Sequence, residues 1–351
     1  MRCYVLRRNR ALLICAGGGI GDSLLASMVA AALKRKFDSV DALTSAGHVD
    51  VLSRNPYISR VLVDRNSVLQ MAGDIRQRDY DAAVVTWATT RTALLPWLAR
   101  IPVRVGQSRR TYSALFTHRV PVVTEQGDTT THWSMVLLDY AKALHCETSD
   151  VRPQFPVTDE EISAADALLQ SVGVGEFALL HATCSWSTKR PMWPLDGWLS
   201  GAQALQRRFG WPVLTCGSPT DAPIGRALAK ELGSPSVAGL TTVGSFAALA
   251  QRSKFVVSMH SGPMHIAAAV GAPTVGVFPL QVDYPDRWRP LGPRVALVRA
   301  RYDCPKSHLI ETCPDYACVR ALDSRDIVAA VERALRPEGS PSVPHESINE
   351  L

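Results

Sequence analysis

The sequence lacks any apolar run that approaches the roughly 20 residues a helix needs to cross a bilayer, which excludes an ordinary transmembrane span. Its first ten residues hold four arginines ahead of a short apolar stretch at residues 11–16, an arrangement that imitates a signal peptide. That stretch runs directly into a glycine loop and a helical pattern, as a first β-strand would. We therefore expect a cytoplasmic protein, with any membrane contact peripheral, on the cytoplasmic face of the inner membrane.

The sequence also lacks a compact metal-binding cysteine signature. Five of its eight cysteines are scattered, mostly in apolar runs, and are expected to be buried thiols of a reducing compartment: Cys3, Cys15, Cys146, Cys184 and Cys216. Cys304, Cys313 and Cys318 are clustered, with eight and four intervening residues. With His308 they could hold zinc or iron. A disulfide or free thiols fit this spacing better, so we predict no metal and no cofactor.

The length and the charge distribution point to two unlike halves. A chain of 351 residues exceeds one ordinary hydrophobic core, so we expect two domains. Residues 1–150 hold 19 Lys and Arg against 13 Asp and Glu, whereas residues 151–351 hold 19 of each, so the first half carries the whole net charge of +6. This excess suits an anionic partner or membrane surface, although it is also common on plain soluble domains. We expect no nucleic-acid partner.

Predicted strands and helices alternate along both halves. Apolar runs predict strands at residues 11–15, 40–44, 81–86, 177–181, 212–216, 255–259 and 274–278. Helical spacing predicts helices at residues 23–37, 195–209, 222–232, 263–270 and 324–335. The alternation implies an α/β fold of two Rossmann-like, doubly wound parallel-sheet domains facing a central cleft. We place the domains at residues 1–152 and 162–336, a linker at 153–161 and a flexible tail at 337–351.

A glycine loop, Gly17-Gly18-Gly19-Ile20-Gly21-Asp22, follows the first predicted strand and opens a helix. A dinucleotide-binding turn would need a small residue in place of Asp22, and a carboxylate in the first helical turn would repel a pyrophosphate bound there. Asp22 could simply cap the helix. We favour a catalytic role, in which its carboxylate takes a proton from a hydroxyl that attacks a sugar.

A second loop, Ser261-Gly262-Pro263-Met264-His265, joins a predicted strand to a helix. Proline suits the first helical position, and the unpaired N–H groups and dipole of a helix start attract phosphate. We predict that Ser261 and Gly262 bind the diphosphate of a sugar nucleotide, with ordinary helix capping as the alternative.

Two further loops follow predicted strands. Lys189 would neutralise the leaving diphosphate, or could be an ordinary surface lysine. Asp221 could accept hydrogen bonds from a ribose, or could only stabilise its turn. The sole literal Asp-x-Asp pair, a pattern that often holds a divalent metal, is Asp79-Tyr80-Asp81, which we interpret as a strand start. A diphosphate bound by a helix terminus and a lysine would not need a metal.

Taken in order, these motifs resemble glycosyltransferase family 9, the heptosyltransferases of lipopolysaccharide inner-core synthesis. The resemblance rests on Gly-Ile-Gly-Asp at residues 19–22, Arg54-Asn55-Pro56-Tyr57-Ile58, Lys189 with Trp193-Pro194, and the segment 261–269. It spans residues 10–335 and therefore nearly the whole chain.

The resemblance implies a GT-B fold with an acceptor-binding N-terminal domain and a nucleotide-sugar-binding C-terminal domain. It implies an inverting, metal-independent transfer, most simply of heptose from ADP-heptose to a lipopolysaccharide-core or other glycan acceptor, with Asp22 as the catalytic base. The implied donor-binding residues are Lys189, Ser187, Thr188, Asp221, Ser261, Gly262, His260 and His265. The expected contacts to an anionic glycan or glycolipid acceptor are Gly19, Gly21, Arg100, Arg104, Arg109 and Arg110.

One position departs from the family pattern, which has an Asp in contact with the sugar immediately before Ser-Gly. The residue here is His260. A carboxylate accepts hydrogen bonds from two hydroxyls, whereas a neutral imidazole offers one donor and one acceptor. We therefore expect a donor sugar with a different hydroxyl pattern, or weaker binding of the usual one. The alternatives are a nucleotide-sugar epimerase or hydrolase of the same fold, and a catalytically silent nucleotide-sugar-binding protein.

Overall fold

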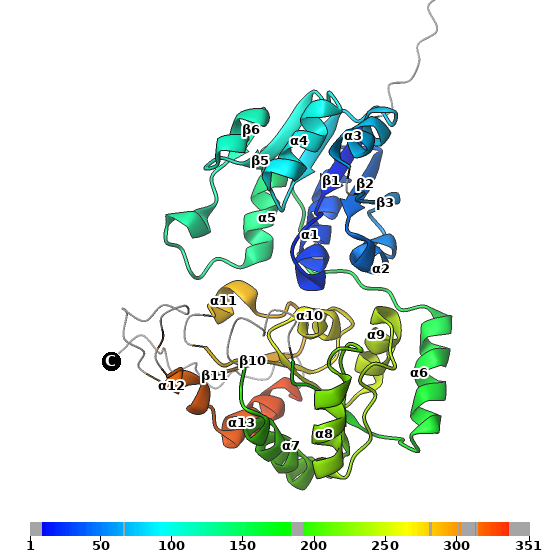
Figure 1. The fold of residues 1–351 in the computed structure, drawn as a ribbon, viewed down its shortest axis with the longest axis vertical. Coiled ribbons are helices and arrows are strands. Elements are labelled where there is room, and N and C mark those ends of the chain that lie inside the picture. Colours follow the sequence, from blue (N-terminus) through cyan, green and yellow to red (C-terminus); the bar gives the residue numbers. More distant parts are fainter. Residues whose placement is uncertain are drawn as a thin grey trace, which may run out of the picture.

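The computed structural model describes residues 9–65, 67–149, 151–183, 192–280, 283–300, 302, 313 and 315–336. These residues form two parallel sheets, one in each half of the chain, with helices packed around them (Figure 1). The predicted α/β fold of two Rossmann-like halves is confirmed. Among the helices of the described segments, none combines the length and the apolar character that a membrane span requires.

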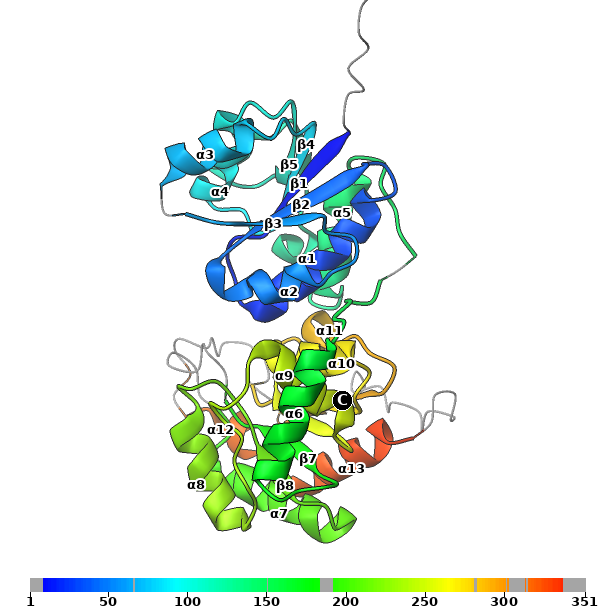
Figure 2. The same ribbon diagram turned by 90° about the vertical axis from the view of Figure 1, so that its right-hand side faces the viewer.

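The N-terminal sheet has the strand order β3-β2-β1-β4-β5-β6, with every pair parallel. Its strands are β1 (Arg10–Ile14), β2 (Ser39–Thr44), β3 (Arg60–Val63), β4 (Ala82–Val85), β5 (Val103–Gln107) and β6 (His118–Val120). One face is covered by α1 (Ile20–Leu33), α2 (Val49–Ser53) and α5 (Trp133–Lys142), and the other by α3 (Val68–Arg76) and α4 (Thr90–Leu98) (Figure 2). The order reverses beside β1, and ligands of such sheets bind at the carboxyl ends of the strands there.

The C-terminal sheet has the order β11-β10-β9-β7-β8, again all parallel. Its strands are β7 (Ala178–His181), β8 (Val213–Thr215), β9 (Val256–Met259), β10 (Thr274–Phe278) and β11 (Val295–Arg299). A parallel bridge between Thr215 and Ser236 extends this sheet beyond β8, so both sheets follow the same winding scheme.

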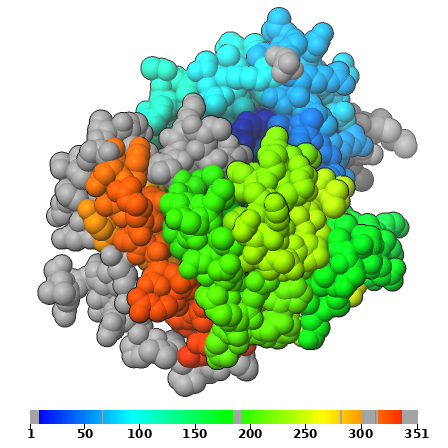
Figure 3. All heavy atoms as spheres, turned by 60° about the horizontal axis from the view of Figure 1, so that its bottom comes forward, coloured from blue at the N-terminus to red at the C-terminus, as the bar shows by residue number. Residues whose placement is uncertain are grey.

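The helices of the C-terminal half are α6 (Asp159–Ser171), α7 (Leu195–Phe209), α8 (Ala222–Leu232), α9 (Val243–Arg252), α10 (Gly262–Ala269), α11 (Pro285–Trp288), α12 (Ala317–Arg320) and α13 (Ser324–Ala334). Helix α13 packs against α7, so the late residues, orange to red in Figure 3, lie against the green middle of the chain. Short 3-10 turns occupy Ala46–His48, Thr111–Leu115 and Val123–Gln126.

Local chemistry explains where these helices begin and end. Thr158 Oγ1 accepts a hydrogen bond from the Glu161 N–H, and a Glu161 oxygen accepts one from the Thr158 N–H, which forms a capping box at the start of α6. Asp159 and Glu160 complete an acidic first turn, whose negative charges interact favourably with the positive end of the helix dipole. Helix α7 ends at Gly210, whose φ of 77° is left-handed and suits glycine.

Arg54, directly after α2, ties the N-terminal half to the first turn of α6 and to the segment before it. Its two terminal nitrogens donate to the two carboxylate oxygens of Glu161, at 2.9 and 2.7 Å, and one also donates to the Pro156 carbonyl. The guanidinium lies 4.5 Å from the ring centroid of Phe155. A two-pronged Arg–carboxylate pair is geometrically specific. Arg54 of the Arg-Asn-Pro-Tyr-Ile motif therefore joins the two halves.

The two halves also share a packed apolar boundary. One hydrophobic cluster contains Leu24 of α1 and Val51 of α2 together with Phe155, Phe246 of α9 and Ile266 of α10. Figures 1 and 2 agree that α1 and α2 face α9 and α10 across this boundary. The carboxyl ends of β1 and β9 lead into the helices that meet there.

Candidate active site

Asp22 lies in the first turn of α1, immediately beyond β1. Its Oδ2 accepts a hydrogen bond of 2.7 Å from the Gly19 N–H, which gives it the capping role. Gly17 and Gly18 have left-handed φ angles of 145° and 68°, and a Cβ on Gly18 would lie 2.6 Å from the Asp22 carboxylate. The loop is thus shaped around this carboxylate. Glycine is required there because of the left-handed backbone and because a side chain would collide with Asp22.

Burial raises the pKa of the Asp22 carboxyl, and the hydrogen bond from Gly19 opposes that rise. Asp22 borders a small pocket between β1, α1, the end of β4 and α5, lined by Cys15, Gly17, Asp22, Ala26, Thr86, Trp87, Trp133 and Leu137. Apolar and aromatic walls therefore surround a carboxylate that is more basic than usual, as a general base requires.

The predicted base and the predicted phosphate loop meet across the boundary. A Cβ on Gly21 would lie 3.0 Å from the His265 ring and 3.5 Å from the Gly262 Cα, and a Cβ on Gly262 would lie 3.2 Å from Ile20. The starts of α1 and α10 therefore touch, with their positive dipole ends close together. Gly21, expected to contact an acceptor, packs here against the C-terminal half.

A polar network surrounds the start of α10. The hydroxyl of Ser261, at the N-cap, donates to the Met259 carbonyl at 3.2 Å and lies 3.4 Å from Nδ1 of His181, the last residue of β7. His181 is buried, and burial lowers its pKa to about 4 despite the nearby Asp221. Its Nε2 lies 3.5 Å from the Thr183 hydroxyl. His181 is therefore a neutral hydrogen-bonding partner beneath the predicted phosphate loop.

Asp221 stabilises its own turn at the end of β8. Its Oδ2 accepts hydrogen bonds from the Ser218 N–H at 2.8 Å and the Ser218 hydroxyl at 2.5 Å. Burial acts to raise the Asp221 pKa, but hydrogen bonds from Ser218 and Thr183 and the His181 charge outweigh it, so the pKa is lowered. A carboxylate that stays ionised at this strand end is compatible with the predicted ribose contact.

His260 is held by the protein rather than presented to a ligand. Its Nδ1 donates to the Val277 carbonyl at 3.1 Å, and its Nε2 lies 3.4 Å from the Asp283 carboxylate. The ring stacks on Phe278 with centroids 4.7 Å apart, and its side chain is 7% exposed. Both polar atoms of the imidazole thus face acceptors of the chain itself.

His265 is buried against the N-terminal half. Burial and the neighbouring His132 and His260 lower its pKa to about 3, so it is neutral. Its Nδ1 is buried and makes no hydrogen bond within the described part of the chain. The Cδ2 edge of the ring faces Gly21 at the point where α1 and α10 meet, beside the predicted phosphate loop.

The structure does not bring the four predicted acceptor arginines together. Arg100 and Arg104 lie at the amino end of β5, whereas Arg109 and Arg110 follow its carboxyl end. The Arg104 guanidinium binds the Leu115 and Ile101 carbonyls at 2.8 and 2.6 Å, which is a structural role. Arg109 and Arg110 are exposed on the side where strand-end ligands bind, and Arg110 pairs with Glu125.

Several predicted site residues lie outside the described residues, namely Ser187, Thr188, Lys189 and Cys304. Cys318 is buried on α12, and Cys313 is partly exposed. Within the described ranges, no three His, Cys, Asp or Glu side chains are grouped closely enough to hold a metal ion. Asp79 and Asp81 precede β4 at the amino end of the sheet, and Asp81 accepts from the Arg10 N–H.

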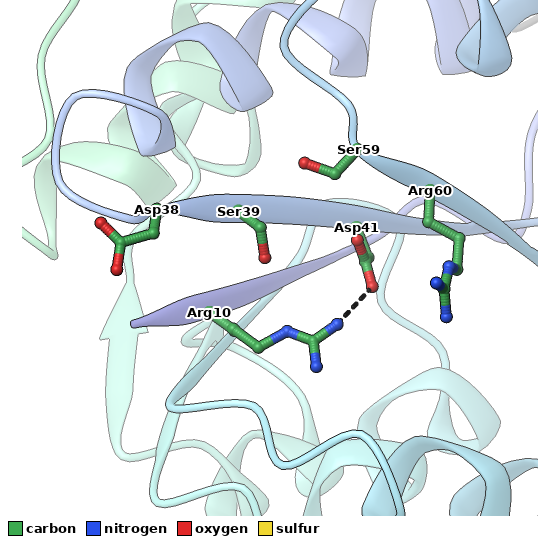
Figure 4. A pocket seen from close by; sticks show the side chains of 6 residues that line it. All are labelled: Arg10, Asp38, Ser39, Asp41, Ser59 and Arg60. Carbon is green, nitrogen blue, oxygen red and sulfur yellow. Dashed lines mark hydrogen bonds and ion pairs between the residues drawn. The ribbon is translucent and has the colours of Figure 1, made fainter. Parts of the chain in front are cut away.

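A larger cavity, of about 340 Å³, opens at that same amino edge of the N-terminal sheet (Figure 4). Two acidic and two basic side chains line it, and Asp41 of this lining binds Arg10 at 3.2 Å and, behind it, the Tyr80 hydroxyl at 2.6 Å. Ligands of doubly wound sheets bind at the opposite edge. The boundary between the halves is therefore the candidate active site.

Sequence reasoning missed the residues that support the predicted ones. His181 and Thr183 end a strand that was predicted, so the strand-end rule could have singled them out. Asp283, His132 and Trp133 come from loops and from a helix start that carry no motif. Their role follows only from which elements pack together.

Comparisons with known proteins identify the family and the fold of this chain. The model of glycosyltransferase family 9 (heptosyltransferase) matches residues 68–315, which include the Ser261–His265 loop and begin after Asp22. Lipopolysaccharide heptosyltransferase 2 of Salmonella typhimurium is 24% identical over 325 residues, covering 82% of this chain and 87% of that protein. Lipopolysaccharide heptosyltransferase 3 of Escherichia coli K12 is 25% identical over 354 residues, covering 92% and 97%. The solved structure of E. coli ADP-heptose lps heptosyltransferase II has the same fold, with a TM-score of 0.73 at 20% identity, covering 92% of this chain and 98% of that one.

Proposed function

The chain belongs to glycosyltransferase family 9 and is a glycosyltransferase, and from this premise we propose that it transfers heptose from ADP-heptose to a hydroxyl of a lipopolysaccharide-core or related glycan acceptor. The transfer inverts the anomeric centre, needs no metal ion and uses Asp22 as the general base. The single observation that supports this most strongly is the contact between the start of α1, which carries Asp22, and the start of α10, which carries Ser261 and Gly262.

In the proposed reaction, the acceptor hydroxyl gives its proton to the Asp22 carboxylate as its oxygen attacks the anomeric carbon of the donor sugar. The bond from that carbon to the diphosphate breaks, and the leaving ADP carries the electron pair. The N–H groups and dipole of α10 stabilise its charge, with the Ser261 hydroxyl and Lys189 as further contacts. A raised Asp22 pKa makes its carboxylate a stronger proton acceptor, which favours the first step.

The proposed acceptor is anionic, and Arg109 and Arg110 are its proposed contacts on the basic N-terminal half. Both are exposed beyond the carboxyl end of β5, the edge at which the reaction would take place. A phosphorylated, membrane-anchored glycolipid would bring the enzyme to the inner-membrane surface by the same charges.

The test is a transfer assay with purified protein, ADP-heptose and a lipopolysaccharide-core acceptor, run with and without excess chelator. We expect acceptor-dependent release of ADP, a glycosylated acceptor by mass spectrometry, and unchanged rates in chelator. Free heptose would indicate a hydrolase and an isomerised sugar nucleotide an epimerase. Binding without turnover would indicate a silent nucleotide-sugar-binding protein, and loss of rate in chelator would contradict the metal-independent mechanism.

A further inference from the structure

Helix α11 of the C-terminal half docks onto the start of α5 in the N-terminal half. Trp288 and Trp133 pack with ring centroids 5.3 Å apart and an interplanar angle of 35°. Arg287 donates a hydrogen bond to the Asp128 carbonyl, and Trp288 with Leu291 packs against the N-terminal core. Aromatic pairs of this kind contribute packing energy beyond the area they bury.

His132, at the N-cap of α5, adds a polar contact to the same docking site. Its Nδ1 accepts from the Ser134 N–H at 3.2 Å, and its Nε2 lies 2.9 Å from the Arg289 carbonyl. Since a carbonyl only accepts, Nε2 carries the proton and the ring is neutral. Two consecutive residues, His132 at the N-cap of α5 and Trp133 at its first position, therefore contact the C-terminal half.

Trp133 also forms part of the wall of the Asp22 pocket. Its indole thus lies against Trp288 of the opposite half and against the pocket that contains the proposed base. The indole Nε1 is buried and finds no hydrogen-bond partner among the described residues. An unpaired buried donor is costly, so this ring position is maintained by packing rather than by polar contacts.

We propose that Trp133 is a positioning residue that couples the docking of α11 to the desolvation of Asp22. With α11 docked, Trp288 holds the indole against the pocket, water is excluded and the carboxylate is a stronger base. When the halves separate, the indole loses its support and Asp22 becomes hydrated and less basic. This inference rests on the proposed role of Asp22 and adds a reason why proton abstraction is confined to the closed enzyme.

The contributions of other titratable groups near Asp22 to the pH profile have to be distinguished from that of Asp22. Cys15 shares the pocket, and burial raises its pKa to about 12. His48 contacts the Ser23 hydroxyl, and burial lowers its pKa. His265, with His132 and His260 beside it, faces Gly21 from α10. The His48→Gln variant checks for a histidine contribution, and we expect it to leave the acidic limb of the pH profile in place.

The test is the pH dependence of kcat/KM in Trp133→Ala, Trp133→Phe and Trp288→Ala, with Trp97→Ala on the exposed face of α4 as the matched control. Trp133→Ala removes the indole wall and Trp288→Ala removes its support. In both variants the acidic limb of the kcat/KM profile should move to lower pH by about half a unit or more, and kcat should fall ~10-fold or more. Trp133→Phe keeps an aromatic wall, so we expect its limb close to that of the wild type.

The outcome separates this inference from the proposed function. The role of Trp133 is overturned if folded Trp133→Ala and Trp288→Ala keep the acidic limb of the wild-type pH profile. If Asp22→Asn is inactive in the same experiments, the assignment of Asp22 as the base stands. Turnover in Asp22→Asn overturns the base itself. If Trp133→Ala does not fold, Trp288→Ala decides alone, and a limb that moves equally in Trp97→Ala also overturns the coupling.

Discussion

At the scale of the single residue, Asp22 combines a structural contact with a chemical cost. Its carboxylate caps α1 by accepting the hydrogen bond from Gly19. Burial raises its pKa, so keeping it ionised at neutral pH lowers the free energy of unfolding. A group whose folded pKa is raised adds stability below its unfolded pKa and loses that contribution as pH rises through the folded value. An amide in its place carries no such cost.

Asp22→Asn should therefore abolish transfer without destabilising the protein. Loss of a general base costs ~10²–10⁴-fold in rate, while Asn can still accept the Gly19 hydrogen bond. The thermal midpoint at pH 7 should be unchanged or higher, and ADP should bind as before. Steady-state kinetics, calorimetry and a melting curve measure all three, and a variant with more than half of wild-type turnover contradicts the assignment.

His260 and Asp283 have to be changed together to test the donor sugar. His260→Asp alone would set a second carboxylate near buried Asp283, and two like charges so close repel each other. We expect His260→Asp with Asp283→Asn to favour ADP-heptose over other donors relative to the wild type, and His260→Ala to lower activity with the native donor. Competition between ADP-sugars measures the preference. Efficient wild-type use of ADP-heptose and a poorer double variant would show His260 to be a working substitute for the family Asp.

The loops that carry the predicted site residues were easier to locate from the sequence than the residues that pack around them. Asp22 and Gly262 were each assigned from a strand end followed by a helix start, and the structure brings their loops into contact. The internal hydrogen bonds of His260 could not be foreseen, because Val277 and Asp283 belong to a neighbouring strand and a later loop. The spread of the four arginines along β5 depended on locating a strand that the sequence did not reveal.

At the scale of the element, the close approach of α1 and α10 requires glycine on both sides. Gly21→Ala would place a Cβ 3.0 Å from the His265 ring and push the helix starts apart. We expect transfer to fall at least ~10-fold, since small misplacements of reacting groups are costly. The matched control is Gly73→Ala, on α3 of the same half, where a Cβ meets nothing within 4 Å.

Gly73→Ala should stabilise the protein by up to about 1 kcal/mol, through helix propensity, and leave activity unchanged. Turnover assays and denaturant midpoints of the two variants distinguish the effects. Equal activity in both variants would mean that the contact between α1 and α10 is not needed for transfer.

The strands that the sequence predicted are mostly the central ones of each sheet. Strands such as β1, β4 and β9 are buried on both faces and read as continuous apolar runs. The strands it missed include the edges β3, β6 and β11, whose alternating or charged residues resemble loops. Edge strands face solvent on one side, so their hydrophobic signal is weaker.

At the scale of the whole molecule, buried neutral histidines make stability depend on pH. Burial lowers the pKa of His181 to about 4 and of His265 to about 3, below the value of 6.5 in an unfolded chain. Their contribution is complete above pH 6.5 and is lost as pH falls toward the folded values, at up to about 1.4 kcal/mol per pH unit for each histidine.

The urea midpoint for unfolding of the protein should therefore fall between pH 7 and pH 5. His265→Gln should flatten this dependence, whereas His118→Gln, on exposed strand β6, should not. Urea titrations monitored by tryptophan fluorescence provide the comparison. A midpoint that is constant over this range would show that these histidines are not buried and neutral in solution.

The apolar cluster shared by α1, α2, α9 and α10 has a consequence for how the chain is divided. Leu24 and Val51 are covered by residues that lie more than a hundred positions later, so neither half completes its surface alone. Cutting the polypeptide in the linker would leave two fragments with complementary hydrophobic surfaces. Such fragments are candidates for a split reporter, in which recovery of sugar transfer shows that the two fragments have associated.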